Sequence, residues 1–239
     1  MPRPDGRLPQ ALRPVLITPN VNRWAEGSCE IEFGDTVVLC TASVEEFVPR
    51  FRRDTGLGWL TAEYDMLPRS TAERRNRARE SGRPDSRALE ISRLVGRSLR
   101  AVVDFAQLGP RTITLDCDVV QADGGTRTAA ITGAWVALKE AVEWLRGRKM
   151  ISGNPLKDSV AAISVGVVGD EELLDLCYAE DSRAAVDFNV VMTGRQRLIE
   201  LQGTGEERPF SREQLNRLLD LAEVGIVELT RLQQAALQA

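Results

Sequence analysis

Residues 112–138 read TITLDCDVVQADGGTRTAAITGAWVAL, a segment that passes from an alternating pattern through two glycines into a long apolar run. Every second residue in the first part is apolar, which predicts a strand over 111–120 with one buried face. The part after Gly124-Gly125 predicts a helix over 127–146. The double glycine therefore lies between a strand and the start of a helix.

The same reasoning predicts the other elements. Alternation around Gly34-Asp35 predicts a β-hairpin over 29–42, and an amphipathic pattern predicts a helix over 86–104. Further strands are predicted at 59–66, 159–168, 172–179, 186–193 and 197–203. The helices do not alternate regularly with the strands, so we expect an α+β fold. The expected organisation is one domain over 1–239, with an N-terminal arm at about 1–14 and a C-terminal helix at about 211–238.

The composition excludes several kinds of chemistry. The chain has 239 residues and no histidine, which removes Ser-His-Asp triads, His-ligated zinc and imidazole acid–base catalysis. Its four cysteines, Cys29, Cys40, Cys117 and Cys177, show no CxxC spacing and are expected to be buried reduced thiols. No apolar run reaches the roughly 18 residues of a membrane span. We therefore expect a soluble, cytoplasmic protein.

The positive charge is concentrated in one part of the chain. The net charge is −4, yet residues 50–111 hold fourteen arginines against eight acidic residues. Arginine supplies 28 of the 31 basic residues, and its planar fork suits phosphate groups. Codon bias explains part of the arginine total, but the uneven distribution indicates a localised surface for anions.

Three short motifs could together form one site, made of a phosphate cradle, an arginine clamp and a pair of carboxylates. Gly124, Gly125, Thr126 and Arg127 can hold an anion, because glycine allows close approach and Thr126 can cap a helix whose first amides are free. Arg87 lies in the first turn of the predicted helix 86–104. Asp181 and Asp187 come together at one end if the strands on either side of them pair as a hairpin. Two carboxylates side by side can bind a hard divalent ion such as Mg²⁺, or raise the pKa of one of them so that it serves as an acid. Each motif also has a plain structural interpretation: a tight turn, a solvated helix face, and aspartates that favour turns.

Long strings in the chain resemble bacterial RNase PH. They extend over almost its whole length: LRPV (12–15), AEGSCEIEFGDTVVLCTASVEE (25–46), VPRF (48–51), GWLTAEYDMLPRST (58–71), LEISRLVGRSLRAVVD (89–104), TITLDCDVVQADGGTRTAAITGAWVAL (112–138), AAISVGVV (161–168), EDSRAAVDFNVVMT (180–193) and IELQGTGEERPFS (199–211).

The resemblance implies an RNase PH-like fold, which is shared with the second domain of ribosomal protein S5. It implies a phosphate-dependent 3′-to-5′ exoribonuclease that removes 3′ nucleotides from precursor tRNA as nucleoside diphosphates, reversibly. Its partners are then RNA, inorganic phosphate and further copies of the chain in a homohexameric ring of three dimers. Carried onto this sequence, phosphate binds at Arg87, Gly125, Thr126 and Arg127, and Asp181 and Asp187 hold Mg²⁺.

Further roles follow from the same resemblance. Asp187 is the better candidate for acid assistance to the leaving oxygen, and Arg69, Arg74 and Arg77 serve RNA contact and ring assembly. The chain departs from the family at Ser86 and Ala88, where Gly and Thr are usual, and at Asp65, where a small residue is usual. A catalytically silent RNA-binding ring subunit is the alternative function. A small-molecule phosphotransferase is a third, disfavoured because the chain lacks a nucleotide-binding glycine motif.

Overall fold

The computed structural model describes residues 3–77 and 85–238, which form two β-sheets and their covering helices. The first sheet has the strand order β1-β2-β3-β5-β4. Only β4 and β5 in this sheet run parallel. Its strands are β1 (Val15–Pro19), β2 (Gly27–Phe33), β3 (Thr36–Glu45), β4 (Trp59–Met66) and β5 (Thr112–Gln121). The predicted hairpin is confirmed as the β2–β3 pair, with Gly34 at φ 54° in its turn.

The second sheet is antiparallel throughout and has the order β7-β6-β8-β9. Its strands are β6 (Val160–Val168), β7 (Glu171–Leu174), β8 (Val186–Thr193) and β9 (Leu198–Gly205). β6 lies at its centre and reads as a continuous apolar run, because eight of its nine residues are buried.

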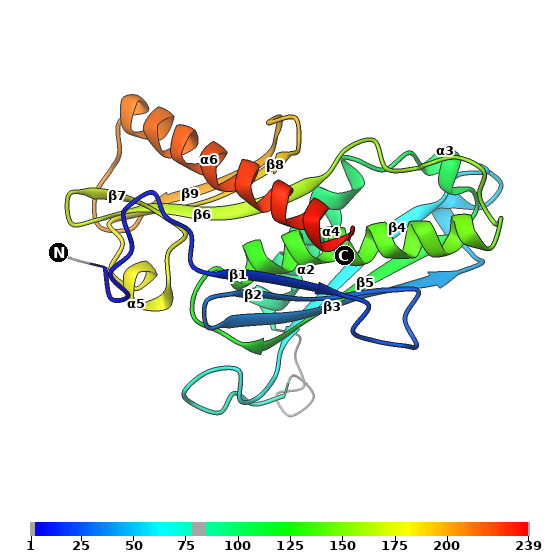
Figure 1. Ribbon diagram of the computed structural model, residues 1–239, viewed down its shortest axis with the longest axis horizontal. Helices are drawn as coiled ribbons and strands as arrows, with labels where there is room; N and C mark the ends of the chain where they lie inside the picture. Colours follow the sequence, from blue (N-terminus) through cyan, green and yellow to red (C-terminus); the bar gives the residue numbers. More distant parts are fainter. Residues whose placement is uncertain (1–2, 78–84, 239) are drawn as a thin grey trace.

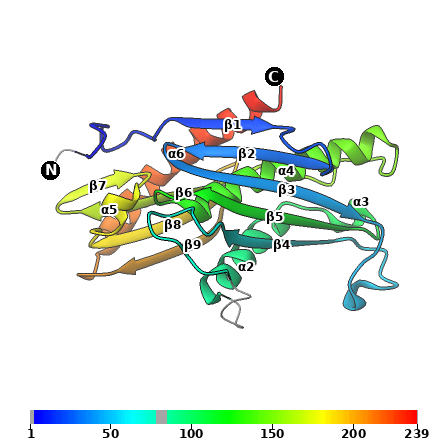
Figure 2. The ribbon, with the colours of Figure 1, turned by 90° about the horizontal axis from the view of Figure 1, so that it is seen from below.

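The helix α4 (Thr126–Gly147) packs against both sheets, touching β2, β3 and β5 on one side and β6 on the other (Figure 1). Its contact with the first sheet is close, because a Cβ atom on Gly27 of β2 would lie 2.0 Å from the Ala137 carbonyl oxygen. The other long helices flank it: α2 (Ser86–Arg100) covers β4, and α6 (Arg212–Ala236) covers β6. Figure 2 shows the strands of the first sheet side by side, with the second sheet continuing beyond them.

Three short helical segments complete the fold: η1 (Arg50–Arg52), α3 (Phe105–Leu108) and α5 (Tyr178–Asp181). The α+β class is confirmed, but three details of the sequence prediction are wrong. The helix predicted over 86–104 ends at Arg100, the strand predicted over 172–179 ends at Leu174, and β1 was not predicted. All four cysteines are buried free thiols, and no helix among the described residues is long and apolar enough to cross a membrane.

Candidate active site

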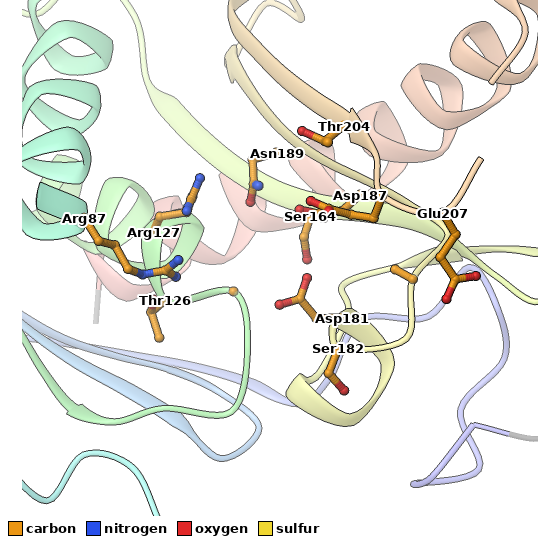
Figure 3. Close-up of a pocket in the computed structure, with 13 residues that line it drawn as sticks. Arg87, Thr126, Arg127, Ser164, Asp181, Ser182, Asp187, Asn189, Thr204 and Glu207 are labelled. Atoms are coloured by element: carbon orange, nitrogen blue, oxygen red, sulfur yellow. The ribbon is translucent and has the colours of Figure 1, made fainter. Parts of the chain in front are cut away.

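An open pocket of about 530 Å³ lies where the two sheets meet. The first turns of α2 and α4 form one wall, and α5, β8 and the segment after β9 form the other (Figure 3). Six residues singled out from the sequence line it together: Arg87, Gly125, Thr126, Arg127, Asp181 and Asp187. The other lining residues are Ser164, Ser182, Ala184, Asn189, Thr204, Glu206 and Glu207.

The loop that enters α4 depends on its two glycines. Gly124 and Gly125 have φ angles of 73° and 64°, which favour glycine strongly. Gly125 occupies the N-cap position, so the expectation that Thr126 caps the helix is wrong. Thr126 is the first helical residue, and its hydroxyl instead accepts a hydrogen bond of 2.8 Å from the Tyr64 hydroxyl. The first amides of α4 therefore remain free of side-chain caps at the wall of the pocket.

Gly124 also allows the two halves of the molecule to touch. A Cβ atom there would lie 2.7 Å from the Tyr178 nitrogen and 2.8 Å from the Leu176 oxygen, both of which are backbone atoms beside α5. Because backbone atoms cannot move aside cheaply, a side chain at this position would separate the loop from α5.

We expect Gly124→Ala to lower the free energy of unfolding by about 2–4 kcal/mol, as left-handed strain of about 1 kcal/mol and overpacking add together. Gly169→Ala is the matched control, since Gly169 has φ 63° and open space around a Cβ atom. Urea unfolding should show a loss of only about 1 kcal/mol for the control. Equal losses in the two variants would contradict the close contact at Gly124.

Two arginines enter the pocket from the same side. Arg87 extends from the first turn of α2, which the Asp85 carboxylate caps through the Arg87 amide at 2.9 Å. Arg127 extends from the first turn of α4, where Gln202 accepts a hydrogen bond from its guanidinium at 3.2 Å. Within residues 3–77 and 85–238, the Arg87 guanidinium has no ion-pair or hydrogen-bond partner. Figure 3 shows the Arg87 guanidinium beside Thr126, and both arginines on the side of the pocket opposite the aspartates.

The two aspartates lie on the side of the pocket opposite the arginines, but not for the reason expected from the sequence. β7 pairs with β6 and not with β8, so no hairpin brings Asp181 and Asp187 together. Instead, the chain leaves β7 at Asp175, which has φ 57°, and α5 then carries Asp181 at its end. Asp187 lies on β8 beside Gly166 of β6. The short helix α5 therefore supplies one carboxylate, and the strand β8 supplies the other.

The pocket changes the acidity of both carboxyl groups. Burial, followed by the nearby Asp181 charge, raises the pKa of Asp187 to about 6. Burial also raises the pKa of Asp181, against the lowering effect of Arg87 and Arg127. The Oδ1 atom of Asp187 is buried without a hydrogen-bond partner in the structure. A carboxylate of this kind is ready to accept a cation or a donor from a ligand.

The two carboxylates in the pocket fit the ligands that Mg²⁺ takes from proteins. Among the described residues there is no cluster of three or more acidic, cysteine or histidine side chains that could hold a metal alone. Mg²⁺ usually binds through one or two carboxylates and keeps water or substrate phosphate as its other ligands. Asp181 and Asp187, which line one pocket with Arg87 and Arg127, meet that requirement.

The three arginines expected to contact RNA lie on the segment after β4. Arg69, Arg74 and Arg77 are all exposed there. Arg74 lines a second pocket of about 720 Å³, which shares Arg87, Gly125, Thr126 and Asp181 with the first. Arg69 and Arg77 line neither pocket. Arg75, which the sequence did not single out, pairs with Asp85 at 2.6 Å and so ties this segment to the start of α2.

Several lining residues were missed in the sequence. Asn189 lies two residues after Asp187 on β8 and therefore on the same face of the strand. Its cross-strand partner is Ser164, a buried polar residue inside the apolar run of β6. A polar residue inside the continuous apolar run of β6 was the available signal.

The departures from the family lie outside the pocket lining. Ser86 is the exposed first residue of α2, and Ala88 packs partly against the core. Asp65 is exposed on β4 opposite Asp118 of β5, where its charge contributes to the raised pKa of Asp118 after burial and Asp116. None of the three contributes a side chain to the pocket of Figure 3.

Comparisons with known proteins agree with this fold. A model described as the 3′ exoribonuclease family, domain 1, matches residues 11–142, and one described as domain 2 matches residues 158–225. The chain is similar to rice (Oryza sativa) Rrp46, with a TM-score of 0.79 and 23% identity over 99% of this chain and 100% of that one.

Two archaeal structures are also similar. One is an Archaeoglobus fulgidus exosome with RNA bound to the active site, with a TM-score of 0.78 and 22% identity over 98% of this chain and 92% of that one. The other is an archaeal exosome core, with a TM-score of 0.74 and 22% identity over 98% of this chain and 90% of that one. At these identities the structures establish the fold, while the two family models cover most of the chain. The chain therefore belongs to the 3′ exoribonuclease family that includes RNase PH.

Proposed function

We propose that the protein is a phosphate-dependent 3′-to-5′ exoribonuclease that removes 3′-terminal nucleotides from precursor tRNA as nucleoside diphosphates, in a reversible reaction. The observation that carries the proposal is the pocket itself. Two arginines and the free start of a long helix face two carboxylates across a space of about 530 Å³. This arrangement suits a phosphate ion that attacks a phosphodiester, and it needs neither histidine nor a covalent intermediate.

Arg87, Arg127 and the first amides of α4 would hold inorganic phosphate. Its oxygen then forms a bond to the phosphorus of the last internucleotide linkage, and the bond from that phosphorus to the 3′ oxygen breaks. The released product is the terminal nucleoside 5′-diphosphate, and the RNA is one nucleotide shorter. The two planar guanidinium groups are donors to the negative charge that develops in the transition state.

Asp187 is the group placed to supply a proton to the leaving 3′ oxygen, since it lies deeper in the pocket than Asp181. Asp181 and Asp187 would hold Mg²⁺, which when bound offsets phosphate charge. Ser164 and Asn189 lie beside Asp187 and offer neutral polar groups to a ribose. The pocket thus separates cationic groups for the attacking phosphate from acidic groups near the leaving oxygen.

The RNA strand would reach this pocket over the arginine-rich surface. Arg74 lines the adjoining space of about 720 Å³, and Arg69 and Arg77 extend from the same segment. Phosphate contacts of this kind give affinity without sequence preference. We further propose a homohexameric ring of three dimers, supported by the likeness to exosome chains, and a cytoplasmic location, supported by four reduced thiols.

A silent RNA-binding ring subunit is the alternative function. The likeness to a chain of an archaeal exosome core favours it, since that chain belongs to a larger assembly. The complete set of arginines and aspartates in one pocket favours catalysis instead, because a binding subunit has no need for opposed cations and carboxylates.

The proposal predicts which products appear from a tRNA with a 3′ extension. With Mg²⁺ and inorganic phosphate, we expect nucleoside diphosphates to accumulate, and without phosphate we expect no release. Thin-layer or mass-spectrometric identification of the nucleotides decides the matter. Monophosphates released without phosphate would establish hydrolysis and overturn the mechanism. RNA binding without any release would favour the silent subunit.

A further inference from the structure

The N-terminal segment is anchored beside the candidate active site. Residues 3–14 contain no helix or strand, yet Figure 1 shows them lying against β7 and α5. Arg3 and Arg13 are 6% and 4% exposed, which is unusual for arginine. Arg3 binds Glu180 at 2.7 Å, and Arg13 binds Asp175 at 2.7 Å. The two carboxylate partners are themselves buried, at 1% and 0% exposed.

Arg13 joins two segments that are far apart in sequence. Its backbone amide, Nε and Nη2 donate to the Asp175 carboxylate at 2.8, 3.0 and 2.7 Å. Its Nη1 donates to the carbonyl oxygen of Asp123 at 2.6 Å. The guanidinium fork is therefore shared between the end of β7 and the loop that enters α4. A lysine could not satisfy both partners, because its ammonium group lacks the planar fork.

Both segments lead directly to residues of the pocket. Asp123 is followed by Gly124 and Gly125, and a Cβ atom on Gly125 would lie 3.0 Å from Nη2 of Arg13. Asp175 precedes Cys177, the N-cap of α5, which carries Asp181. Asp123 also accepts a hydrogen bond from the Tyr178 amide at 3.1 Å, so the loop and α5 touch directly.

We propose that Arg13 is a positioning residue for phosphorolysis. Through Asp123 and Asp175 it holds the loop 123–127, here called the phosphate loop, and the helix α5, which carries Asp181, at a fixed separation. The inference rests on the proposed function of the pocket. Arg13 does not line the pocket, so it acts through the loop and α5 and not by contact with substrate. A displacement of about 1 Å between groups that act together lowers turnover strongly, which makes a rigid link behind them valuable.

Arg7 provides a matched control. It belongs to the same segment and donates to the backbone oxygens of Ala11 at 3.0 Å and Asp175 at 3.2 Å. It also pairs with the carboxylates of Asp175 at 3.4 Å and Glu180 at 3.6 Å, so it shares the α5 side of the link with Arg13 but not the loop. No contact between Arg7 and the loop 123–127 is found among the described residues. Arg7→Lys therefore loosens the N-terminal segment without releasing the phosphate loop.

The test compares Arg13→Lys with Arg7→Lys in the full chain. Hydrogen exchange should rise at residues 124–128 in Arg13→Lys and stay unchanged there in Arg7→Lys, which has no contact with the loop. At residues 177–181 it should rise more in Arg13→Lys than in Arg7→Lys. The Michaelis constant for phosphate should rise about tenfold in Arg13→Lys, while its dissociation constant for RNA measured without phosphate stays unchanged. Equal effects in the two variants, or faster exchange spread over the whole chain, would overturn the inference and leave only a general stabilising role.

A second variant and a second readout cover the cases in which Arg13→Lys does not fold or the wild-type protein is inactive. If Arg13→Lys does not fold, Asp175→Asn gives the same readouts, because it keeps the shape of the partner and weakens the ion pair. If the wild-type protein shows no phosphorolysis, the proposed function fails. Hydrogen exchange then decides the inference alone: a rise confined to 124–128 and 177–181 supports the link, and a uniform rise overturns it.

Discussion

Asp187→Asn is expected to lose phosphorolysis by about a thousandfold and yet to unfold at a higher temperature than the wild-type protein at pH 8 without divalent ions. The loss of activity follows from the removal of a proton donor, a group that typically contributes between a hundredfold and ten-thousandfold. The same substitution removes one of the two carboxylates proposed to hold Mg²⁺. Both effects fall on turnover, and neither requires a change in the fold.

The gain in stability follows from the raised pKa. Burial and the Asp181 charge raise the pKa of Asp187 from its ordinary 3.8 to about 6, so the folded state binds this proton more tightly than the unfolded state. Stability is therefore lost as the pH rises from about 4 to 6, and the loss is complete above that range. It corresponds to about 3 kcal/mol at about 1.4 kcal/mol per pH unit, reduced to about 2 kcal/mol because the side chain is partly solvated.

Asparagine has no charge to bury, so the variant escapes this loss. For a chain of this size, about 2 kcal/mol raises the melting temperature by about 5 °C at pH 8, and the difference should shrink as the pH falls toward 4. Melting curves in EDTA at both pH values measure it. Asp116→Asn is the control, because burial also raises the pKa of Asp116 but that residue lies on β5 outside the pocket. The control should gain stability and keep its activity, and a less stable Asp187→Asn at pH 8 would contradict the argument.

The sequence predicted those elements whose pattern is local. The alternation of β5 and the apolar run of α4 extend over many residues, so their bounds were predicted within one or two positions. β8 was predicted at its observed bounds for the same reason. The strand predicted over 172–179 ends early because the chain turns at Asp175, where φ is 57°. Asp175 and Glu180 look like surface residues in a linear sequence. In the structure they are buried partners of arginines from residues 3–13, which are more than 160 positions away.

In the candidate site too, the sequence predicted what is local and missed what depends on contacts between distant segments. The two glycines and Arg127 lie within four consecutive residues, so their joint chemistry can be inferred from the local sequence alone. Asp181 and Asp187 are adjacent in space through an α5–β6–β8 arrangement that the sequence did not reveal, and the hairpin used to join them does not exist. Arg13 carried no chemical signal at all, because its partners are a backbone carbonyl and a carboxylate on distant segments. Such a contact becomes visible only once the tertiary fold is known.

Removal of either pocket arginine should abolish phosphate binding in practice. Arg87 and Arg127 lie on the same side of the pocket, and two like charges held close together are stabilised by an anion between them (Figure 3). We expect Arg87→Ala and Arg127→Ala each to lower kcat/KM for phosphorolysis by a hundredfold to a thousandfold, the loss typical for one donor to a developing charge. Arg127→Lys should retain part of the activity, since it keeps the charge and loses the fork.

Thermal shift with inorganic phosphate separates this effect from a loss of RNA binding. Phosphate should raise the melting temperature of the wild-type protein and leave that of Arg87→Ala unchanged, because a ligand stabilises only the state that binds it. Arg93→Ala is the matched control: Arg93 is exposed on the same helix, two turns from Arg87, and lines neither pocket. It should respond to phosphate as the wild type does. An Arg87→Ala protein that phosphate still stabilises would place the anion elsewhere, and the assignment of Arg87 to the phosphate site would then be wrong.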